Sequence, residues 1–178
     1  MEKITVKDLL SEYRQGRRNF RELNLSGADL FEQDLQRIDL SGSDLSGTRL
    51  AYANLGWANL KGANLQGAEL SSAILQSACL EEANLQKAVL CRALLYNSNL
   101  READISGANL QMADLRYANL QAADLTDVDA QSCNLDRADL RGTTLYRCNL
   151  FRCRLVNLQG ARISRTTILP NGHRADDL

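Results

Sequence analysis

The chain has 178 residues, of which 44% are hydrophobic and 5% aromatic, so we expect one domain with an aliphatic core. Lys and Arg number 21 against 22 Asp and Glu, and a net charge of −1 favours attraction to neither nucleic acid nor membranes. There is no apolar run of membrane-spanning length and no signal-peptide pattern, which predicts a cytoplasmic protein.

Residues 1–17 have a helical pattern of their own. Thr5 is placed as an N-cap with Asp8 at the third helical position, and Gly16 is placed to end the helix. The apolar face of this helix consists of Val6, Leu9, Leu10 and Tyr13. The pattern predicts a short capping α-helix that covers the first unit of the region that follows.

A five-residue repeat begins at position 18. A small residue, an Asp or Asn, a large aliphatic residue and two freer positions recur, most clearly from Ala103 to Leu125. The aliphatic centre falls on every fifth residue from position 20 to 155, and those that are not Leu are Phe20, Ile105 and Ala130. This period predicts three extended residues and a two-residue corner, with the centre and the residue two before it pointing inward.

Glycine positions indicate the size of one coil. Seven glycines lie at the second position after a centre: Gly27, Gly42, Gly47, Gly62, Gly67, Gly107 and Gly142. If a coil has four segments and twenty residues, all of them fall at only two of its four corners, which favours this coil length. Stacked coils are then joined by parallel ladders about 4.8 Å apart. We expect type II turns at Gly47, Gly67 and Gly107, and turns without positive φ after Leu55, Leu75 and Leu95.

These repeats resemble the A-(D/N)-L-x-x units of the pentapeptide-repeat family, over residues 18 to about 168. The resemblance implies an all-β solenoid: a right-handed, four-sided parallel β-helix of about seven to eight coils. It also implies a protein that is not an enzyme, since members are non-catalytic. The best understood members resemble duplex DNA in shape and charge and bind gyrase. We therefore divide the chain into a capping helix (1–17), a β-helix (18–170) and a polar C-terminal tail (171–178).

Two irregularities interrupt the repeat. At Val128-Asp129-Ala130 the large and small inward residues are interchanged, which preserves volume and predicts local repacking. Leu155 is followed at once by Val156, so two corner residues are missing, and the inward centres are expected to continue at Ile163 and Ile168. Pro170 then ends the ladder.

No residue pattern indicates catalysis, a cofactor or a metal. The five cysteines contain no C-x-x-C, and His173 lies in the expected tail. Cys133 and Cys153 occupy the small inward position one coil apart, as buried small hydrophobes or, alternatively, as a redox staple that needs an oxidising compartment. The repeated Asp and Asn residues are expected to bond neighbouring backbone or each other rather than to act as acid-base pairs.

Apolar side chains gather at outward positions on one wall. Trp57, Tyr96 and Tyr117 lie there, and Ile74 and Leu94 replace the expected Asp or Asn in adjacent coils. The predicted protein-binding residues, with additions from the preceding wall, are Tyr52, Trp57, Ile74, Val89, Leu94, Tyr96, Met112 and Tyr117. The alternative is incidental drift at tolerant positions.

Three functions stay open. The favoured one is a non-catalytic interaction module that presents this surface to an unidentified protein partner or to a second copy of the chain, without nucleic acid, membrane or cofactor. A DNA mimic that binds gyrase would need a continuous acidic face, whereas this wall mixes Asp114 and Asp136 with Arg37, Arg116 and Arg137. The third is a structural protein with no dedicated ligand.

Overall fold

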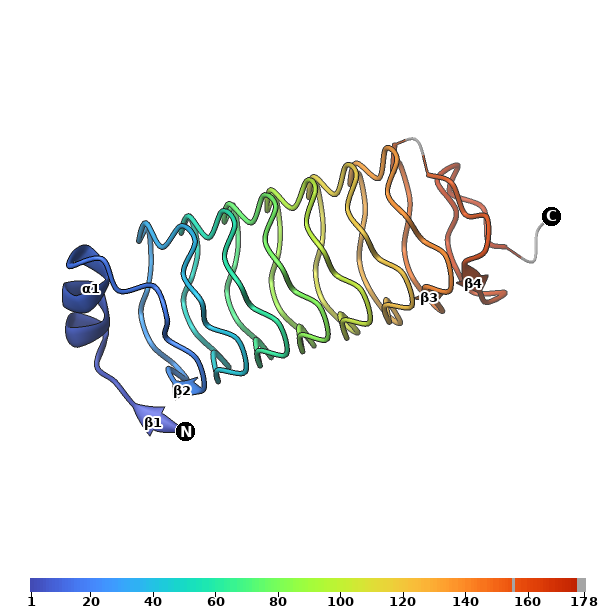
Figure 1. The fold of residues 1–178 in the computed structure, drawn as a ribbon. Helices are drawn as coiled ribbons and strands as arrows, with labels where there is room; N and C mark the ends of the chain where they lie inside the picture. The colour runs from blue at the N-terminus through green and yellow to red at the C-terminus, as the bar shows by residue number, and fades with distance from the viewer. Residues whose placement is uncertain (155, 176–178) are drawn as a thin grey trace.

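The computed structural model describes residues 1–154 and 156–175. The chain winds into a straight rod of stacked coils, with helix α1 (Val6–Arg14) at one end and the C-terminal residues at the other (Figure 1). Two parallel strand pairs lie near the ends: β1 (Glu2–Lys3) with β2 (Leu23–Asn24), and β3 (Thr144–Leu145) with β4 (Arg162–Ile163).

Successive coils are joined by parallel bridges between residues 20 apart. One column of bridges runs through Asn54, Ile74, Leu94 and Asp114, and three further columns repeat this pattern around the coil. The amide of Leu55 donates to the carbonyl of Ile74 at 2.7 Å, and the amide of Leu75 donates to the carbonyl of Leu94 at 2.7 Å. This pairing confirms the twenty-residue coil and makes the molecule a parallel β-helical solenoid.

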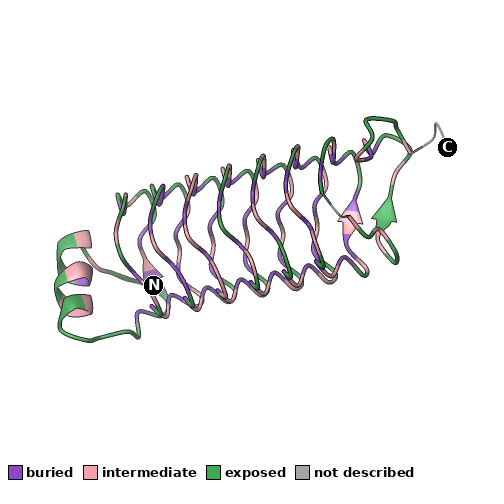
Figure 2. Ribbon diagram, turned by 90° about the horizontal axis from the view of Figure 1, so that it is seen from above, coloured by how far each residue is buried: buried purple, intermediate pink, exposed green. Residues whose placement is uncertain are grey.

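The interior is filled by the inward side chains of the repeat, and buried positions recur around each coil (Figure 2). Central Leu residues such as Leu50 and Leu75 are fully buried, and so are the small residues Ala53 and Ala73. Val128 and Ala130 are both buried, which confirms that their interchange repacks the core. Stacked Leu columns with Ala between them therefore form one continuous aliphatic core.

Hydroxyl groups that point inward bond to backbone carbonyls. Thr48 Oγ1 donates to the carbonyl of Leu45 at 2.7 Å, and Thr143 Oγ1 donates to that of Leu120 at 2.7 Å. Among the described residues, no buried side-chain nitrogen or oxygen is without a hydrogen-bond partner. Polar residues at the small inward position are therefore part of the packing and do not form a buried polar site.

Between positions 20 and 154, the second residue after each centre has a positive φ. The prediction of turns without positive φ after Leu55, Leu75 and Leu95 is wrong, because Trp57, Ser77 and Asn97 have φ of 58°, 55° and 57°. The amide of Trp57 donates to the carbonyl of Gln76 in the next coil at 2.9 Å, as the amide of Gly47 does to Gln66 at 2.9 Å. The ladder therefore imposes a positive φ on glycine and non-glycine corners alike.

Helix α1 begins and ends as its sequence indicates. Thr5 is the N-cap and its hydroxyl accepts a hydrogen bond from the amide of Asp8 at 3.1 Å. Gly16 follows the C-cap with a φ of +100°. Leu9 is buried against the first coils, and Tyr13 Oη donates to the carbonyl of Gln36 at 2.9 Å. The helix thus covers the N-terminal end of the core.

The ladder changes register near its C-terminal end. The predicted slip begins at Leu155, which lies outside the described residues. Beyond it, Thr144 pairs with Arg162 at an offset of 18, and Asn149 pairs with Ile168 at an offset of 19. The offset between paired residues therefore falls from 20 to 18 and then rises to 19 within the last described coil.

The predicted inward centres of this coil are only partly correct. Ile168 is not a centre, because Thr167 and Leu169 on either side of it are buried. The preceding turn begins at Ser164, where the amide of Thr167 donates to the Ser164 carbonyl at 3.0 Å, and this places one extra residue in the segment. Ile163 pairs with Leu145 but is 43% exposed, since the described chain places no further coil over it.

The C-terminal segment expected to be a tail is paired with the chain as far as Ala175. The amide of Leu169 donates to the carbonyl of His173 at 2.8 Å, and the amide of Ala175 donates to that of Thr167 at 3.0 Å. Gly172, with a φ of +88°, allows the turn after Pro170. Residues 171–175 therefore form an antiparallel return, and 176–178 lie outside the described residues.

Candidate protein-binding surface

The predicted binding residues surround one wall of the rod. We call them the apolar band: Tyr52, Trp57, Ile74, Val89, Leu94, Tyr96, Met112 and Tyr117. Ile74 and Leu94 are paired neighbours in the middle column of this wall. Tyr52 and Met112 lie at one of its corners, and Trp57 and Tyr117 at the other, three coils apart in each case. Val89 lies on the neighbouring wall, where it is bridged to Glu69 and Asn109.

The structure exposes five of the eight side chains. Tyr52 and Met112 are 57% and 55% exposed, Trp57 and Tyr117 are each 48% exposed, and Leu94 is 38% exposed. The other three, Ile74, Val89 and Tyr96, are half-buried. The terminal segments lie at the two ends of the rod and do not cover its middle coils (Figure 1). The middle of this wall is thus open to a partner.

The left-handed corners hold the large side chains outward. Tyr52, Trp57, Met112 and Tyr117 occupy the corner position with φ of 58° or 59°. Their backbone amides donate into the next coil; that of Tyr117, for example, reaches the carbonyl of Asp136 at 2.9 Å. The positions of these side chains are therefore fixed by the ladder and not by a flexible loop.

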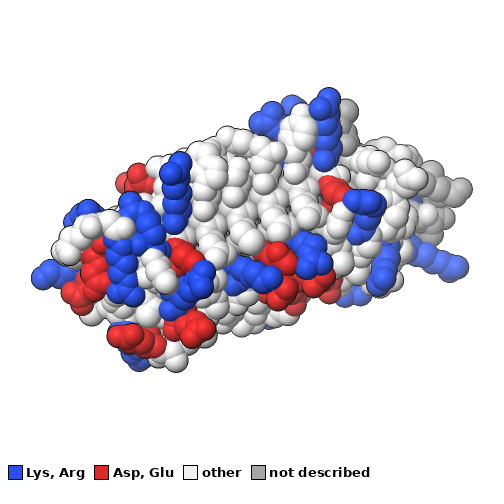
Figure 3. All heavy atoms as spheres, viewed as in Figure 1, with Lys and Arg blue, Asp and Glu red and all other residues white. Residues whose placement is uncertain are grey.

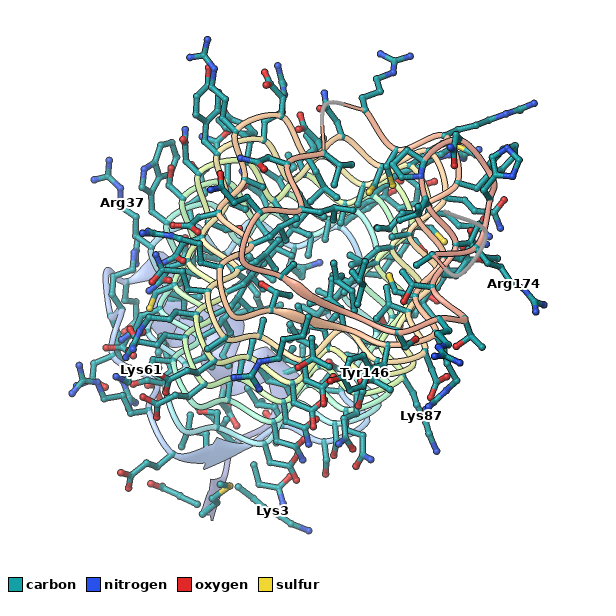
Figure 4. The ribbon with its side chains drawn as sticks, turned by 90° about the vertical axis from the view of Figure 1, so that its right-hand side faces the viewer. Lys3, Arg37, Lys61, Lys87, Tyr146 and Arg174 are labelled. Carbon is teal, nitrogen blue, oxygen red and sulfur yellow. The ribbon has the colours of Figure 1, made fainter. Side chains whose placement is uncertain are left out.

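Cationic and aromatic neighbours extend the band: the sequence placed Arg37 and Arg137 on this wall but not among the binding residues, and it did not indicate Phe31. The Arg37 guanidinium lies 5.7 Å from the ring centroid of Trp57, and that of Arg137 lies 5.4 Å from the ring of Tyr117. The Phe31 ring packs edge-on against Tyr52 at 5.8 Å. The labelled Arg37 projects from a corner when the rod is viewed along its axis (Figure 4). An offset of 20 or 21 residues relates each pair, so the coil length could have identified them.

A hollow of about 350 Å³ lies within the band, lined by Tyr96, Asn97, Arg116 and Tyr117. Tyr96 Oη donates a hydrogen bond to Gln76 Oε1, which holds one wall of the hollow. Arg116 Nη2 lies 2.6 Å from Asp114 Oδ2, and this bond is the main cause that lowers the pKa of Asp114. The hollow has aromatic sides and a paired charge at its rim, a combination that suits an apolar side chain of a partner.

Charges on the rod are of both signs, and several of them form ion pairs. Lys and Arg lie beside Asp and Glu on the face drawn in Figure 3, and an uncharged strip crosses its middle. Ion pairs join Glu81 to Arg101 at 2.7 Å and Asp127 to Arg147 at 2.6 Å. The face drawn in Figure 3 thus shows acidic side chains interrupted by basic ones.

The repeated carboxylates bond the corners. Asp104 Oδ1 accepts from the amide of Ser106 at 3.0 Å and from its hydroxyl at 2.6 Å. Asn84 Nδ2 donates to Asn64 Oδ1 at 3.1 Å in the same column, one coil apart. Within the described residues, no group of three or more His, Cys, Asp or Glu side chains is placed to hold a metal ion. The outward Asp and Asn residues therefore stabilise the backbone.

A larger hollow, of about 570 Å³, lies where the ladder changes register. Arg137, Asp139, Arg141 and Gly160 are among its lining residues. The Arg141 guanidinium forms an ion pair with Asp139, with Nη2 and Oδ2 2.5 Å apart. The described lining of this hollow offers no metal-ligand cluster and no unpartnered buried polar atom.

Among the described residues, no helix has the length and apolarity needed to cross a membrane.

The fold and the apolar band define a rod-shaped β-helical repeat protein with exposed apolar side chains gathered along one wall. The family model described as Pentapeptide repeats (8 copies) matches the chain over four overlapping ranges, 24–62, 48–86, 78–121 and 118–157. The chain belongs to the pentapeptide-repeat family.

The chain is similar to several solved structures, and the likeness to QnrB1 supports the fold. Two structures of trypsin-treated QnrB1, a plasmid-mediated fluoroquinolone resistance protein, have TM-scores of 0.68 and 0.66 at 19% and 20% identity. Each alignment covers 86% of this chain and 80% of QnrB1. HetL, a pentapeptide repeat protein involved in heterocyst differentiation regulation in the cyanobacterium Nostoc sp. strain PCC 7120, is 28% identical, with 96% of this chain and 99% of HetL covered and a TM-score of 0.33. Among curated proteins no match was found.

Proposed function

We propose that this chain is a non-catalytic protein–protein interaction module of the cytoplasm. The chain forms a right-handed, four-sided β-helix of seven to eight coils, and the apolar band on its surface contacts a partner protein. The observation that carries the proposal is the exposure of Tyr52, Trp57, Met112 and Tyr117 around Leu94 on one rigid wall. Aromatic residues and Met are enriched in the cores of protein interfaces, whereas an isolated exposed apolar residue is ordinary.

Rigidity supports this function. A partner that binds the apolar band orders little of this chain, because the corner side chains are held by the hydrogen-bonded ladder. The hollow between Tyr96 and Tyr117 accepts one apolar side chain at the centre of the contact. The paired charge of Arg116 and Asp114 at its rim favours partners with polar groups around that side chain.

The gyrase-binding alternative has less support. A DNA mimic needs a continuous acidic surface, whereas Arg residues are paired with Glu81, Asp114, Asp127 and Asp139 along the rod. Similarity to QnrB1 at about 20% identity supports the fold and does not extend to a partner. We expect no inhibition in a gyrase supercoiling assay.

A photo-crosslinking experiment tests the proposal. A photoreactive phenylalanine analogue replaces Tyr117 in the band or Tyr146, a 40% exposed tyrosine next to Leu145 and outside the band. After irradiation in a native cytoplasmic extract, we expect protein adducts from position 117 and few from position 146. Equal labelling from both positions, or adducts only to nucleic acid, would contradict the proposal. Adducts to the same chain would identify a second copy as the partner.

A further inference from the structure

Two buried thiols lie next to each other near the C-terminal end of the rod. Cys133 Sγ and Cys153 Sγ are 2.9 Å apart. The two residues occupy the same inward column in adjacent coils, and the amide of Arg154 donates to the carbonyl of Cys133 at 3.0 Å. Four preceding coils have Ala in this column: Ala53, Ala73, Ala93 and Ala113. The pair thus replaces two adjacent alanines at the last coils that keep the twenty-residue register.

We propose that Cys133 and Cys153 form a reversible disulfide that joins these two coils. Adjacent parallel segments lie about 4.8 Å apart, which is within the range of about 4.4–6.8 Å between Cα atoms that a disulfide spans. Residues beyond Arg154 leave the regular register, since Thr144 pairs with Arg162. A cross-link at this point holds the last regular coil to the rod.

The two thiols have different roles in the reaction. Cys133 is fully buried, whereas Cys153 is 8% exposed. Their mutual hydrogen bond raises the pKa of Cys133 and lowers the pKa of Cys153, so Cys153, whose Sγ also donates to the carbonyl of Ala130 at 2.9 Å, is the thiol that loses its proton more readily. A thiolate is the attacking species in disulfide exchange. Cys153 is therefore the residue that reacts first.

The oxidant is a small disulfide such as glutathione disulfide. Cys153 loses its proton, and the resulting thiolate attacks one sulfur of glutathione disulfide, which breaks that S–S bond, leaves a mixed disulfide on Cys153 and releases one glutathione thiolate that takes up a proton. Cys133 then loses its proton, and its sulfur attacks Cys153 Sγ and displaces the second glutathione thiolate. The protein loses two hydrogens and gains one S–S bond, while glutathione disulfide is reduced to two thiols.

Cys148 provides a matched control. It is fully buried like Cys133, and burial raises its pKa to about 12. Its column contains Ala108 and Val128 in the two preceding coils, so it has no stacked thiol. Cys133→Ala and Cys153→Ala restore the residue that this column has elsewhere, and both variants are therefore expected to fold.

The experiment incubates the folded full-length chain with glutathione disulfide, or with reduced glutathione as reference, and then alkylates free thiols after unfolding. Peptide mapping should give a single disulfide between Cys133 and Cys153, with Cys148 alkylated. By closing a loop of about 20 residues, the bond should raise Tm by roughly 5–10 °C. The Cys148→Ala variant should show the same shift, and the Cys133→Ala variant should show none.

Two results would overturn the proposal. One is complete alkylation of both Cys133 and Cys153 after prolonged exposure of the folded protein to glutathione disulfide. The other is an equal rise of Tm in Cys133→Ala, which would show that the effect does not come from this bond.

Discussion

A backbone angle that L-amino acids seldom adopt recurs at the corners of the rod. Side-chain-bearing residues at these corners have φ between 54° and 60°, including Ala122 at 57°. The left-handed conformation costs about 1–2 kcal/mol for a residue with a Cβ atom. The ladder offsets this cost, because the corner amides donate across the coils, as that of Ala122 does to Arg141 at 3.0 Å.

The exposed corner residue Ala122 gives a direct test of this strain. Ala122→Gly should raise the free energy of unfolding by up to about 1 kcal/mol, since relief of the positive φ exceeds the added entropy of the unfolded chain. Ala123→Gly, at the buried neighbour, should lower it, because it removes a core methyl group without relieving strain. Urea unfolding measures both; a loss of stability in Ala122→Gly would show that the corner is unstrained.

Carboxylates at the repeat position make the rod sensitive to acid. Burial raises the pKa of Asp104, but hydrogen bonds from the Ser106 hydroxyl, the Ser106 amide and Gln86 outweigh it and lower the pKa overall. A depressed folded-state pKa contributes stability above the unfolded-state value of about 3.9, and this contribution is lost as pH falls through the folded-state value.

Asp104→Asn should therefore reduce the acid sensitivity. Asn keeps the acceptor for the Ser106 amide and can donate in the column, as Asn84 does to Asn64 at 3.1 Å. Gln86 Nε2 loses the acceptor Asp104 Oδ2, so we expect a modest loss in the free energy of unfolding at pH 7 and a smaller fall than in the parent from pH 5 to pH 2 (roughly the range of carboxyl titration). Parallel pH curves for parent and variant would contradict this account of Asp104.

At the level of elements, the stacked Leu columns hold the coils together. The strands are short and most coils meet at single bridges, so burial of apolar area has to supply most of the stability. Leu65 is fully buried, and the next residue, Gln66, is exposed. The two positions are adjacent in the chain and differ in the side of the wall that they face.

Leu65→Ala should lower the free energy of unfolding by about 2–5 kcal/mol, the usual cost of a core cavity. Gln66→Ala should change it by less than about 0.5 kcal/mol, because the side chain is on the surface. Denaturant unfolding of both variants measures the difference. Similar losses in the two variants would mean that the inward register is assigned incorrectly.

The sequence predicted the repeating elements better than the ends. Regular centres, the twenty-residue coil and the Thr5 cap follow from local patterns that the structure keeps. The corners after Leu55 and Leu75 could not be predicted from side-chain preference, because inter-coil hydrogen bonds determine their φ. The shift from Ile168 to Leu169 arises from one extra residue at Ser164, which the five-residue pattern does not reveal.

At the scale of the whole molecule, the coil length determines which residues of the apolar band lie on the same wall. Trp57 and Tyr117 are 60 positions apart in the chain, yet both lie on one corner, because that separation is three coils. The twenty-residue period therefore predicted which side chains share a wall. It did not predict how deep each one lies: Tyr96, whose hydroxyl bonds to Gln76, is half-buried.

The affinity of a captured partner for two variants tests most directly whether the apolar band is the binding surface. Trp57→Ala combined with Tyr117→Ala removes two exposed rings from the apolar band, and Tyr146→Ala removes a similarly exposed ring outside it. Aromatic anchors in an interface commonly contribute at least about 2 kcal/mol each, so we expect the double variant to bind at least about 100-fold more weakly. Tyr146→Ala should bind like the parent, and all three proteins should have similar Tm. Unchanged affinity in a folded double variant would contradict the assignment of the apolar band as the binding surface.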